Sequence, residues 1–335
     1  MAMVLSRSGQ QNNAGDQNAL FLKQFAGEVL AVFEETNVMM PLHTVRTISQ
    51  GKSAQFPAVG TAVARYHTPG ESIIEDTDAG GDNYLSSIKS NEVVITINDL
   101  LLSGAFVANL DEAKNHYDVR SEYTRQMGFA LANEADKTLL NYGLLGARAA
   151  TDRFGGTDYI GTTIDVHDGT GVQVPTGAEM VAAIVDAAQV LDEKDVPSND
   201  RYCVLAPAQY YAMVEENKDA INRDYGNDGN GSLASGVVLS VAGIRIMKSN
   251  HIPTADWTPD AGDLGSASGA YDFTGTEAKR PQALVFQRSA LGTVKLMDLS
   301  IESEYQVERQ GTLMVAKYAM GHDILRNEAL VELAI

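Results

Sequence analysis

The stretch that decides the fold, residues 109–146, reads NLDEAKNHYDVRSEYTRQMGFALANEADKTLLNYGLLG. No proline interrupts it, and most of its residues are good helix formers. Asn109 and Glu112 have the spacing of a capping box, in which each side chain binds a backbone N–H of the other's turn. We therefore predict one helix over residues 110–145.

Apolar residues recur along this stretch at steps of three or four, which places them on one helix face. They are Met127, Leu131, Ala135, Leu139 and Tyr142. Gly143 and Gly146 are residues of the kind at which helices end, so we expect the helix to stop there. At 1.5 Å per residue the rod would be roughly 50 Å long, well above the usual helix of about a dozen residues. We interpret it as a spine that carries the other elements.

The composition is that of a globular protein with a strong excess of acid. The chain has 335 residues, of which 44% are hydrophobic and 21% charged, enough for two or three domains. It carries 44 acidic and 25 basic side chains, for a formal net charge of −19. This charge argues against a protein that grips nucleic acid through a broad basic face, although not against one that encloses it.

The sequence shows no sign of a membrane or of an oxidising compartment. No apolar run reaches membrane-spanning length, and residues 1–18 lack the apolar core of a signal peptide. Cys203 is the single cysteine, so no disulfide can form within the chain. We expect a soluble protein that is made in the cytoplasm.

The first 18 residues are rich in Gln, Asn, Ser and Gly. Two interpretations stay open, a frayed terminus or an arm that becomes ordered only on a neighbouring subunit. Residues 20–37 then carry apolar side chains at helical spacing, and such a stripe needs a surface to cover.

Residues 38–98 have the pattern of a long hairpin. Strands are expected at residues 44–48, 53–56, 62–66 and 93–97. Between the hairpin strands, residues 71–87 hold five acids and no base, namely Glu71, Glu75, Asp76, Asp78 and Asp82. This acidic end is either a solvated charged loop or a functional loop, because long loops without secondary structure are uncommon in compact proteins.

The rest of the chain mixes helices and strands without a βαβ rhythm. Residues 152–175 have the composition of a linker or a small hairpin. Thr176 and Glu179 form a capping box that opens a helix, and Pro207 starts another. Strands are expected at residues 202–205, 237–241, 244–247, 283–287, 293–297, 301–307 and 313–318. We predict the α+β class.

No motif of an enzyme or a metalloprotein is present. The six histidines are scattered, and none has a second His or Cys at the spacing of metal ligands. Residues 165–171 lack the closing glutamate of a calcium loop, and residues 227–231 lack the Lys-Ser/Thr of a phosphate-binding loop. Cys203 lies in an apolar stretch and is expected to be a buried, inert thiol. We predict no catalytic residue, no cofactor and no metal.

Several segments together resemble the major capsid proteins of short-tailed phages, the T7-like podoviruses of the autographivirus kind. GKSAQFPAVG at 51–60, followed by YHTPG at 66–70, resembles the extended loop of that family. RYCVLAP at 201–207 resembles its central strand and helix, and AGIRI at 242–246 with SNHIP at 249–253 resembles the next segment of its central domain. The joint order and spacing of these segments carry the resemblance, which covers nearly the whole chain.

The resemblance implies the Hong Kong 97-like coat fold in five parts. These are an N-terminal arm (1–50), an extended loop (51–98), a peripheral domain with the spine helix (99–175), an axial domain (176–285) and return strands of the peripheral domain (286–335). It also implies hexamers and pentamers of the chain in an icosahedral shell, usually of T=7 geometry, in the virion. A scaffolding protein would guide assembly, a portal would replace one pentamer, and double-stranded DNA would be enclosed without sequence-specific binding.

Contacts between subunits are expected on the extended loop, at Lys52, Phe56, Glu71, Glu75, Asp76, Asp78 and Asp82. Some relatives crosslink lysine to asparagine between subunits. Lys52 and Lys89 lie near the loop, but the resemblance does not imply that chemistry for this group. A strongly acidic shell would repel packed DNA, which could then slide in and out.

Two other functions stay open at this point. One is an encapsulin-type compartment shell of the same fold, which would begin with an amphipathic helix and enclose an enzyme rather than nucleic acid. The other is an acidic soluble enzyme, which would be a monomer or small oligomer with a pocket of titratable groups.

Overall fold

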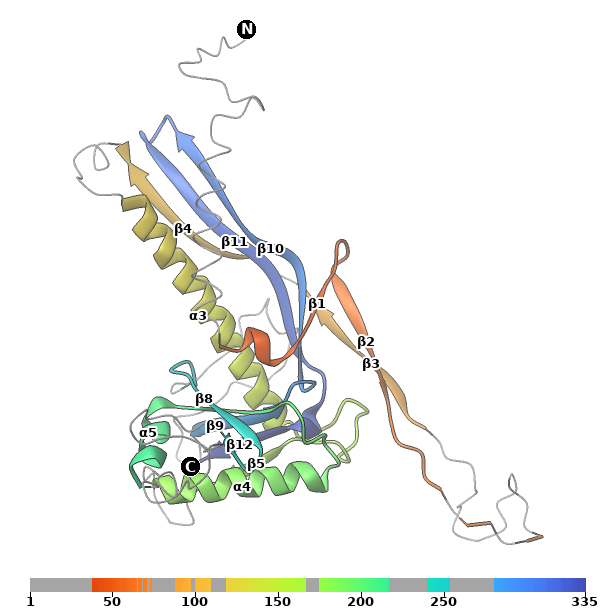
Figure 1. Ribbon diagram of the computed structural model, residues 1–335. Helices are drawn as coiled ribbons and strands as arrows, with labels where there is room; N and C mark the ends of the chain where they lie inside the picture. Colours follow the sequence, from red (N-terminus) through yellow and green to blue (C-terminus); the bar gives the residue numbers. More distant parts are fainter. Residues whose placement is uncertain are drawn as a thin grey trace.

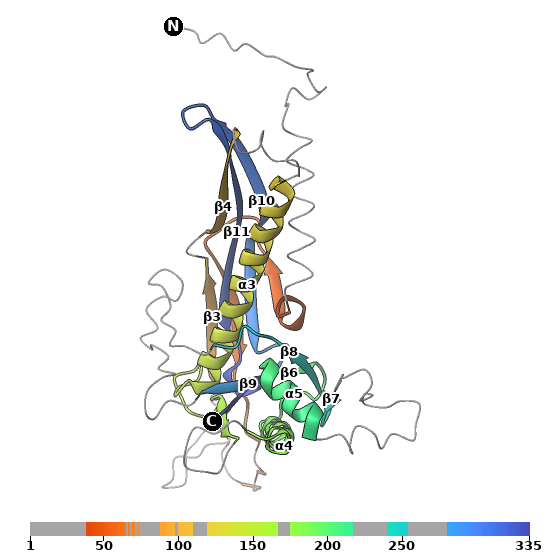
Figure 2. The ribbon, with the colours of Figure 1, turned by 90° about the vertical axis from the view of Figure 1, so that its left-hand side faces the viewer.

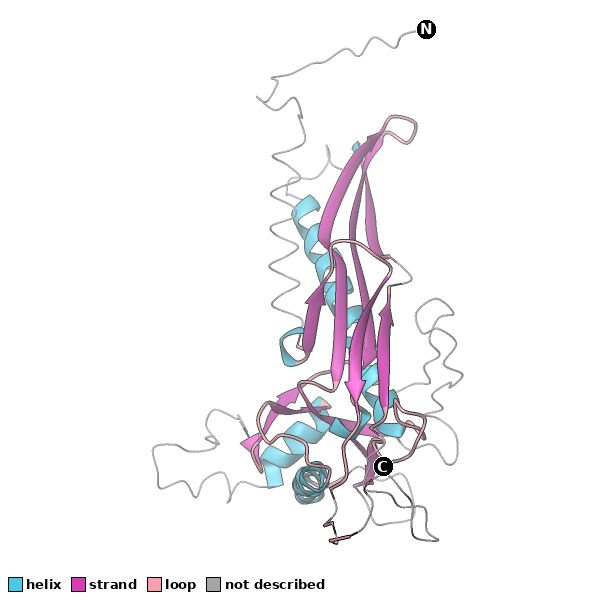
Figure 3. Cartoon of the chain, turned by 90° about the vertical axis from the view of Figure 1, so that its right-hand side faces the viewer, coloured by secondary structure: helices cyan, strands magenta, loops and turns pink. Residues whose placement is uncertain are grey.

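The computed structural model describes residues 38–64, 66–67, 69–70, 73, 88–97, 100–109, 119–166, 175–216, 240–253 and 280–335. The molecule is elongated. A compact body lies at one end of a long helix, a narrow sheet follows the helix to its other end, and a two-stranded hairpin projects from the junction (Figures 1 and 3). Most of the expected arm and the acidic end of the hairpin lie outside the described residues.

The predicted spine is helix α3, described from Val119 to Arg148. Its predicted start, with Glu112 of the capping box, lies outside the described residues. The predicted apolar face is confirmed, since all five of its side chains are buried: Met127, Leu131, Ala135, Leu139 and Tyr142. Met127, Leu131 and Ala135 lie in one hydrophobic core, and Leu139 and Tyr142 lie in another.

The predicted helix end at Gly143 or Gly146 is wrong, because α3 continues to Arg148. A Cβ atom on Gly143 would collide with the side chain of Leu284, and one on Gly146 with that of Leu330. Both glycines therefore act as notches that let a sheet approach the helix closely. Local sequence does not distinguish this packing role from a helix stop.

A four-stranded sheet follows the N-terminal half of the spine in the strand order β1-β10-β11-β4. Its strands are β1 (Thr44–Thr47), β4 (Leu101–Ala108), β10 (Leu291–Gln306) and β11 (Gly311–Ile324). Helix α3 lies along one face of this sheet (Figure 2). Their shared core contains Val107, Leu131, Met314 and Tyr318.

Strand β10 is one continuous element, whereas the sequence predicted two strands at 293–297 and 301–307. Its pairing with β11 shifts register between Lys295 and Met297 and again between Met297 and Ser300. An extra residue in one strand breaks the period-two alternation that sequence patterns depend on. The sequence pattern of the polar residues at this irregularity is therefore typical of a turn between two strands.

A six-stranded sheet forms the compact body in the order β5-β12-β9-β6-β8-β7. Its strands are β5 (Thr162–Asp165), β6 (Arg201–Leu205), β7 (Ser240–Val241), β8 (Ile244–Lys248), β9 (Pro281–Gln287) and β12 (Leu330–Ala334). Helix α4 (Gly177–Glu193) lies below it in Figure 1, α5 (Pro207–Glu216) lies at its left and packs on α4, and the end of α3 packs above it. The predicted Thr176–Glu179 capping box is confirmed at the start of α4.

The last part of the chain is divided between the two sheets. We expected residues 286–335 to return as a whole to the peripheral domain. Strands β10 and β11 lie in the four-stranded sheet, but β12 lies between β5 and β9 in the six-stranded sheet. Strand β5, which we expected in the peripheral domain, lies beside β12 as well.

The hairpin consists of β2 (Ser53–Val59) and β3 (Ser90–Thr96) in antiparallel pairing. Its pairing ends just beyond Val59, where the Gly60 N–H binds the carbonyl of Lys89 at 2.8 Å. The strand predicted at 62–66 is wrong, because residues 61–64 belong to no strand. They follow the last pair of the hairpin ladder, Val59 with Ser90.

Candidate functional site: the root of the projecting hairpin

The hairpin is fixed to the body by one apolar face near its root. Ala54, Ile95 and Ile97 are buried and pack with Val294 and Ala319 of the four-stranded sheet. The opposite face of the hairpin is exposed. A hairpin of two strands is marginal by itself in water, so this packing is what holds its root in place.

The two described contact candidates sit differently on this root. Lys52 is exposed, and its carbonyl accepts the Ile97 N–H at 2.8 Å. Phe56 is half-buried, packs on the cluster around Ile95, and has the Arg46 guanidinium 5.6 Å from its ring centre. Phe56 thus has a packing role inside its own chain, which the sequence did not indicate.

The five acidic candidates lie outside the described residues. They are Glu71, Glu75, Asp76, Asp78 and Asp82. Their expected contacts between subunits stay a prediction.

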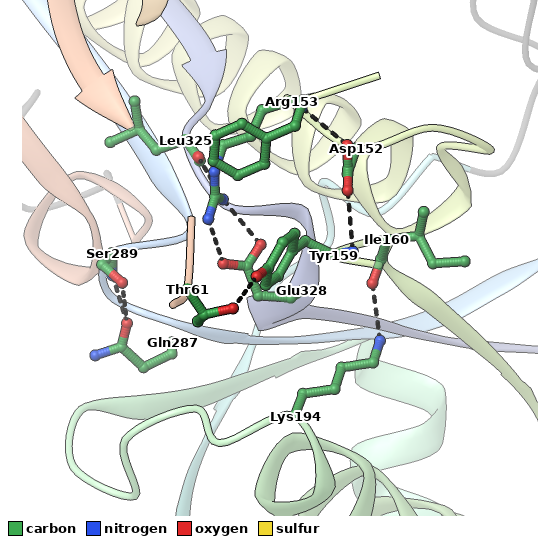
Figure 4. Close-up of polar contacts among 11 residues, drawn as sticks. Thr61, Asp152, Arg153, Tyr159, Ile160, Lys194, Gln287, Ser289, Leu325 and Glu328 are labelled. Carbon is green, nitrogen blue, oxygen red and sulfur yellow. Dashed lines mark hydrogen bonds and ion pairs between the residues drawn. The ribbon is translucent and has the colours of Figure 1, made fainter. Parts of the chain in front are cut away.

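A second set of contacts ties the hairpin to the loop that follows the spine. The Thr61 hydroxyl lies 2.7 Å from the Tyr159 hydroxyl (Figure 4), and the Asn91 amide donates to the carbonyl of Arg153. Lys89 and Asp158 form an exposed ion pair at 3.6 Å, which contributes little because water screens it. The hairpin is therefore bound on both sides of its root.

The loop itself is built around the Asp152 carboxylate. One of its oxygens accepts the N–H groups of Phe154 and Gly156 at 2.8 and 2.7 Å, and the other that of Tyr159 at 3.2 Å. Burial raises the pKa of this carboxyl, but the backbone donors, with Lys89, outweigh burial and hold the pKa below its usual range. An ionised Asp152 fixes the loop shape that presents Tyr159 to the hairpin.

Arg153 connects this loop to the end of the chain. Its guanidinium donates two hydrogen bonds to the Glu328 carboxylate, at 2.9 and 2.8 Å, and a third to the Leu325 carbonyl at 3.2 Å (Figure 4). The rings of Phe154 and Tyr159 lie within 5.1 and 5.7 Å of its charge. The Arg153 and Glu328 side chains are only 12% and 11% exposed, so the pair is far less screened than a surface pair.

An open cleft of about 490 Å³ lies between the hairpin root and the six-stranded body. Its wall on the hairpin side includes residues 56–59, and its wall on the body side includes residues 194–197 and Arg326. Lys194 turns inward, since its ammonium group donates to the Ile160 carbonyl at 2.9 Å. The charged groups Arg153 and Glu328 in this cleft neutralise each other, an arrangement that positions chain segments rather than activating a nucleophile.

Sequence reasoning missed this junction because it treated residues 152–175 as a linker or small hairpin. The only local signal was Asp152 shortly before Gly155 and Gly156, a pattern typical of a turn stabilised by a side-chain oxygen. Glu328 is 175 residues from Arg153, so no local pattern could pair them.

A buried polar cluster, which we call the neck, lies next to the hairpin root. Asp136 of α3 accepts the N–H groups of Val38 and Met39 at 2.9 and 3.2 Å, and His251 Nδ1 lies 3.5 Å from its carboxylate. Burial raises the pKa of Asp136 against the lowering effect of those N–H groups and His251. A carboxylate of the spine thus holds the backbone at residues 38–39.

His43, one residue after the short 3₁₀ helix η1 (Met40–Leu42), continues this cluster. Its Nδ1 lies 2.7 Å from the Met39 carbonyl, which can only accept, so Nδ1 donates. Its Nε2 then accepts from the Thr293 hydroxyl at 2.6 Å, and that oxygen accepts from Nδ1 of His322 at 2.8 Å. Burial lowers the pKa of His43 to about 4, with Lys295 and Arg288 adding to the effect, and that of His322 to about 3.

The remaining chemical candidates are unreactive in their observed places. Cys203 is fully buried, as predicted, and burial raises the pKa of its thiol to about 12, so it stays protonated. In the part of the chain that the structure describes, no three His, Cys, Asp or Glu side chains are grouped to hold a metal ion. No described helix has both the length and the apolar character needed to cross a membrane.

A projecting hairpin, a spine helix and two sheets in this order are matched by known proteins. The family model of the Gp10A-like major capsid proteins matches residues 55–334. The chain belongs to this family of major capsid proteins. It is 36% identical over 331 residues to the major capsid protein of Escherichia phage T7, covering 94% of this chain and 92% of that protein. It is 34% identical over 338 residues to that of Enterobacteria phage T3, with coverages of 97% and 94%.

Solved capsids agree with this assignment. The capsid structure of Cyanophage P-SCSP1u matches with a TM-score of 0.71 and 40% identity, over 88% of this chain and 86% of that chain. A virus-like particle from Pyrococcus furiosus matches with a TM-score of 0.54 at 12% identity, over 93% and 99%, and supports the fold alone. The protein therefore has the Hong Kong 97-like coat fold, forms the capsid shell of a virion together with further copies of itself, and is not an enzyme. The encapsulin and enzyme alternatives are not favoured.

Proposed function

We propose that this major capsid protein builds its shell from hexamers and pentamers, arranged with T=7 geometry around double-stranded DNA. The observation that carries the proposal is full-length similarity to the T7 and T3 major capsid proteins. The projecting hairpin supports it, because an element that extends away from the body beyond its packed root is suited to reach a neighbouring subunit.

The net charge supports enclosure of DNA without binding to it. A chain of charge −19 cannot neutralise many phosphates, so the packed DNA is repelled from the shell wall and stays free to move. Assembly on a scaffolding protein, and a portal at one vertex, belong to the same proposal.

We also propose how the chain is divided into domains. We assign the spine and the four-stranded sheet to the peripheral domain, and the six-stranded sheet with α4 and α5 to the axial domain. Strands β5 and β12 pair directly with each other and lie in the six-stranded sheet, so they go with the axial domain.

The decisive experiment is expression of the protein alone and with its neighbouring genes, followed by electron cryomicroscopy. We expect icosahedral shells with seven subunits in the asymmetric unit, and nuclease-protected DNA of no preferred sequence in particles made with the full set of genes. A different triangulation number would overturn the T=7 geometry, and a protein cargo in place of DNA would overturn the genome-enclosing role.

Lys52, Phe56 and the five acids of the hairpin end are proposed to contact the next subunit. Changing Glu71, Glu75, Asp76, Asp78 and Asp82 to Gln or Asn should leave the subunit's own fold nearly unaltered, because five acids without a base in their segment can only repel one another within it. The melting temperature of the shell should then depend less on salt between about 0.05 and 1 M. Identical salt curves for wild-type and variant shells would mean that the acids are only a solvated face.

A further inference from the structure

The six-stranded body has two flanks that differ in charge. Its sheet begins with β5 at one edge and ends with β7 at the other. Helix α4 crosses beneath the sheet between them. Gly177 at its start touches the α5 backbone, and Lys194 at its end binds the Ile160 carbonyl next to β5. The end of α4 and the β7–β8 edge therefore face away from each other.

The flank at the end of α4 presents acids. Four exposed carboxylates gather in the last turn of α4 and the loop to β6: Asp192, Glu193, Asp195 and Asp200. The bases of the same segment are withdrawn, because Lys194 turns inward and Arg201 is 4% exposed in its ion pair with Asp192. The Asp192 side chain is still 68% exposed. We call these four acids the acidic flank.

The position of the acidic flank is unfavourable for the subunit by itself. The C-terminal end of a helix carries partial negative charge, so bases are favoured there and acids are not. The last turn of α4 contains no base. Asp192 is compensated inside the subunit by its ion pair with Arg201, so the acids whose benefit is to be sought outside the subunit are Glu193, Asp195 and Asp200.

The flank at the β7–β8 edge presents bases and an aromatic ring. Arg245 and Lys248 of β8 are exposed, and Tyr211 of α5 is 55% exposed. The Lys248 ammonium donates to the Tyr211 hydroxyl at 3.0 Å and lies 5.1 Å from that ring's centre. Glu215, one turn along α5, is the nearest exposed acid in the sequence of that helix. We call Arg245, Lys248 and Tyr211 the basic flank.

We propose that the basic flank of one copy docks on the acidic flank of the next copy around each ring of subunits. Contacts between two different surfaces of one chain repeat head to tail, and such contacts form a ring when the rotation from copy to copy closes. Opposite charges fix the orientation of approach and suppress like-with-like pairing. Tyr211, held in place by Lys248, supplies the apolar area that charges alone do not.

The position of the hairpin root supports a second copy of the chain as the docking partner. Asp195 of the acidic flank lines the same cleft as residues 56–59 of the hairpin root. The acidic flank thus continues the side of the subunit from which the hairpin projects. This inference rests on the proposed rings of subunits and adds the surface that forms them.

Charge reversal with rescue tests the pairing. Lys248→Glu and Glu193→Lys, each alone, should lower the yield of assembled shells at low salt several-fold, since each places like charges across every ring contact. The chain with both changes restores opposite charges at every contact and should regain most of the wild-type yield. Lys137→Glu, at an exposed position on the spine, is the matched control for charge alone and should not gain from Glu193→Lys.

Two further measurements distinguish this pairing of flanks from its alternatives. Circular dichroism should show all variants folded, and the neutral pair Lys248→Gln and Glu193→Gln should flatten the salt dependence of shell melting. Single reversals that assemble like wild type, or a double reversal no better than the worse single one, would overturn the pairing. Wild-type shells of hexamers and pentamers would still stand in that case, so the proposed function is tested separately.

Discussion

The two sheets of the molecule differ in how completely they are covered. The six-stranded sheet is enclosed between the end of α3 and helices α4 and α5, and every residue of β6 and β12 is buried. The four-stranded sheet has the spine on one face only. On its other face Leu102 and Phe106 of β4 are 56% and 41% exposed.

The hairpin root covers this other face around Val294 and Ala319. Among the described residues no element covers its part around Leu102 and Phe106, which we call the bare face. Leu313 and Val315 of β11 pair with Phe106 and Gly104 of β4, so the exposed apolar residues form a patch rather than isolated side chains. Large apolar patches on soluble proteins mark interaction sites. We expect the bare face to contact neighbouring copies in the shell.

The largest effect is expected in the covered sheet. Leu139 is fully buried in the core that α3 shares with the six-stranded sheet. Leu139→Asp would bury a carboxylate and lose packing, and should lower the free energy of unfolding by roughly 3–5 kcal/mol. We expect insoluble subunits, measured by the soluble fraction after expression. A soluble, folded variant that forms shells would contradict this placement.

A smaller loss is expected at the junction between the sheets. Arg153→Met removes the partner of Glu328 and leaves a buried carboxylate uncompensated, which should cost about 3 kcal/mol in urea unfolding. The double variant Arg153→Met with Glu328→Gln removes both charges and should regain much of that loss. Equal stability of the single and double variants would show that the pair is not a buried charge pair in solution.

The neck should respond to acid. The pKa of His43 is about 4 in the folded chain and about 6.5 in the unfolded chain, so the unfolded state binds more protons between these values. The stabilisation by neutral His43 is therefore complete above pH 6.5 and is lost as the pH falls toward 4. At pH 5 the loss is about 2 kcal/mol.

The measurement is the difference in urea unfolding free energy between wild type and His43→Asn at pH 7 and at pH 5. The variant is the necessary reference, because burial raises the pKa of Asp323 to about 6, which changes stability in the opposite direction. A difference between the two proteins that is the same at both pH values would exclude a neutral, buried His43.

The smallest effect on the subunit is expected on the bare face. Leu102→Asp makes the same chemical change as Leu139→Asp at an exposed position, and should alter the free energy of unfolding by less than about 0.5 kcal/mol. Shell yield should nevertheless fall, because the charge would have to be desolvated against a neighbouring copy. Normal shells from this variant would mean that the bare face stays in contact with solvent.

Periodicity and capping patterns predicted the elements whose determining residues lie only a few positions apart in the sequence. The spine, its buried face and the Thr176–Glu179 box follow from residues a few positions apart. The α+β class and the capsid assignment were also confirmed, the latter from the joint order of several segments.

The features that the sequence did not predict depend on residues far apart in the chain. Gly143 and Gly146 looked like helix stops because Leu284 and Leu330, which fill the notches, are well over a hundred residues away. The Arg153–Glu328 pair and the insertion of β12 beside β5 have the same origin. Such contacts are set by the topology of the whole chain, which local propensity does not encode.

The irregular pairing of β10 with β11 between Lys295 and Ser300 has a mechanical consequence. A ladder is stiff where its hydrogen bonds are regular and bends where an extra residue interrupts them. The strand continues for six residues beyond Ser300, which is a length of roughly 20 Å at about 3.4 Å per residue. A bend of about 10° there would displace the far end by about 3 to 4 Å, so we expect this end of the sheet to adjust its position between copies of the chain.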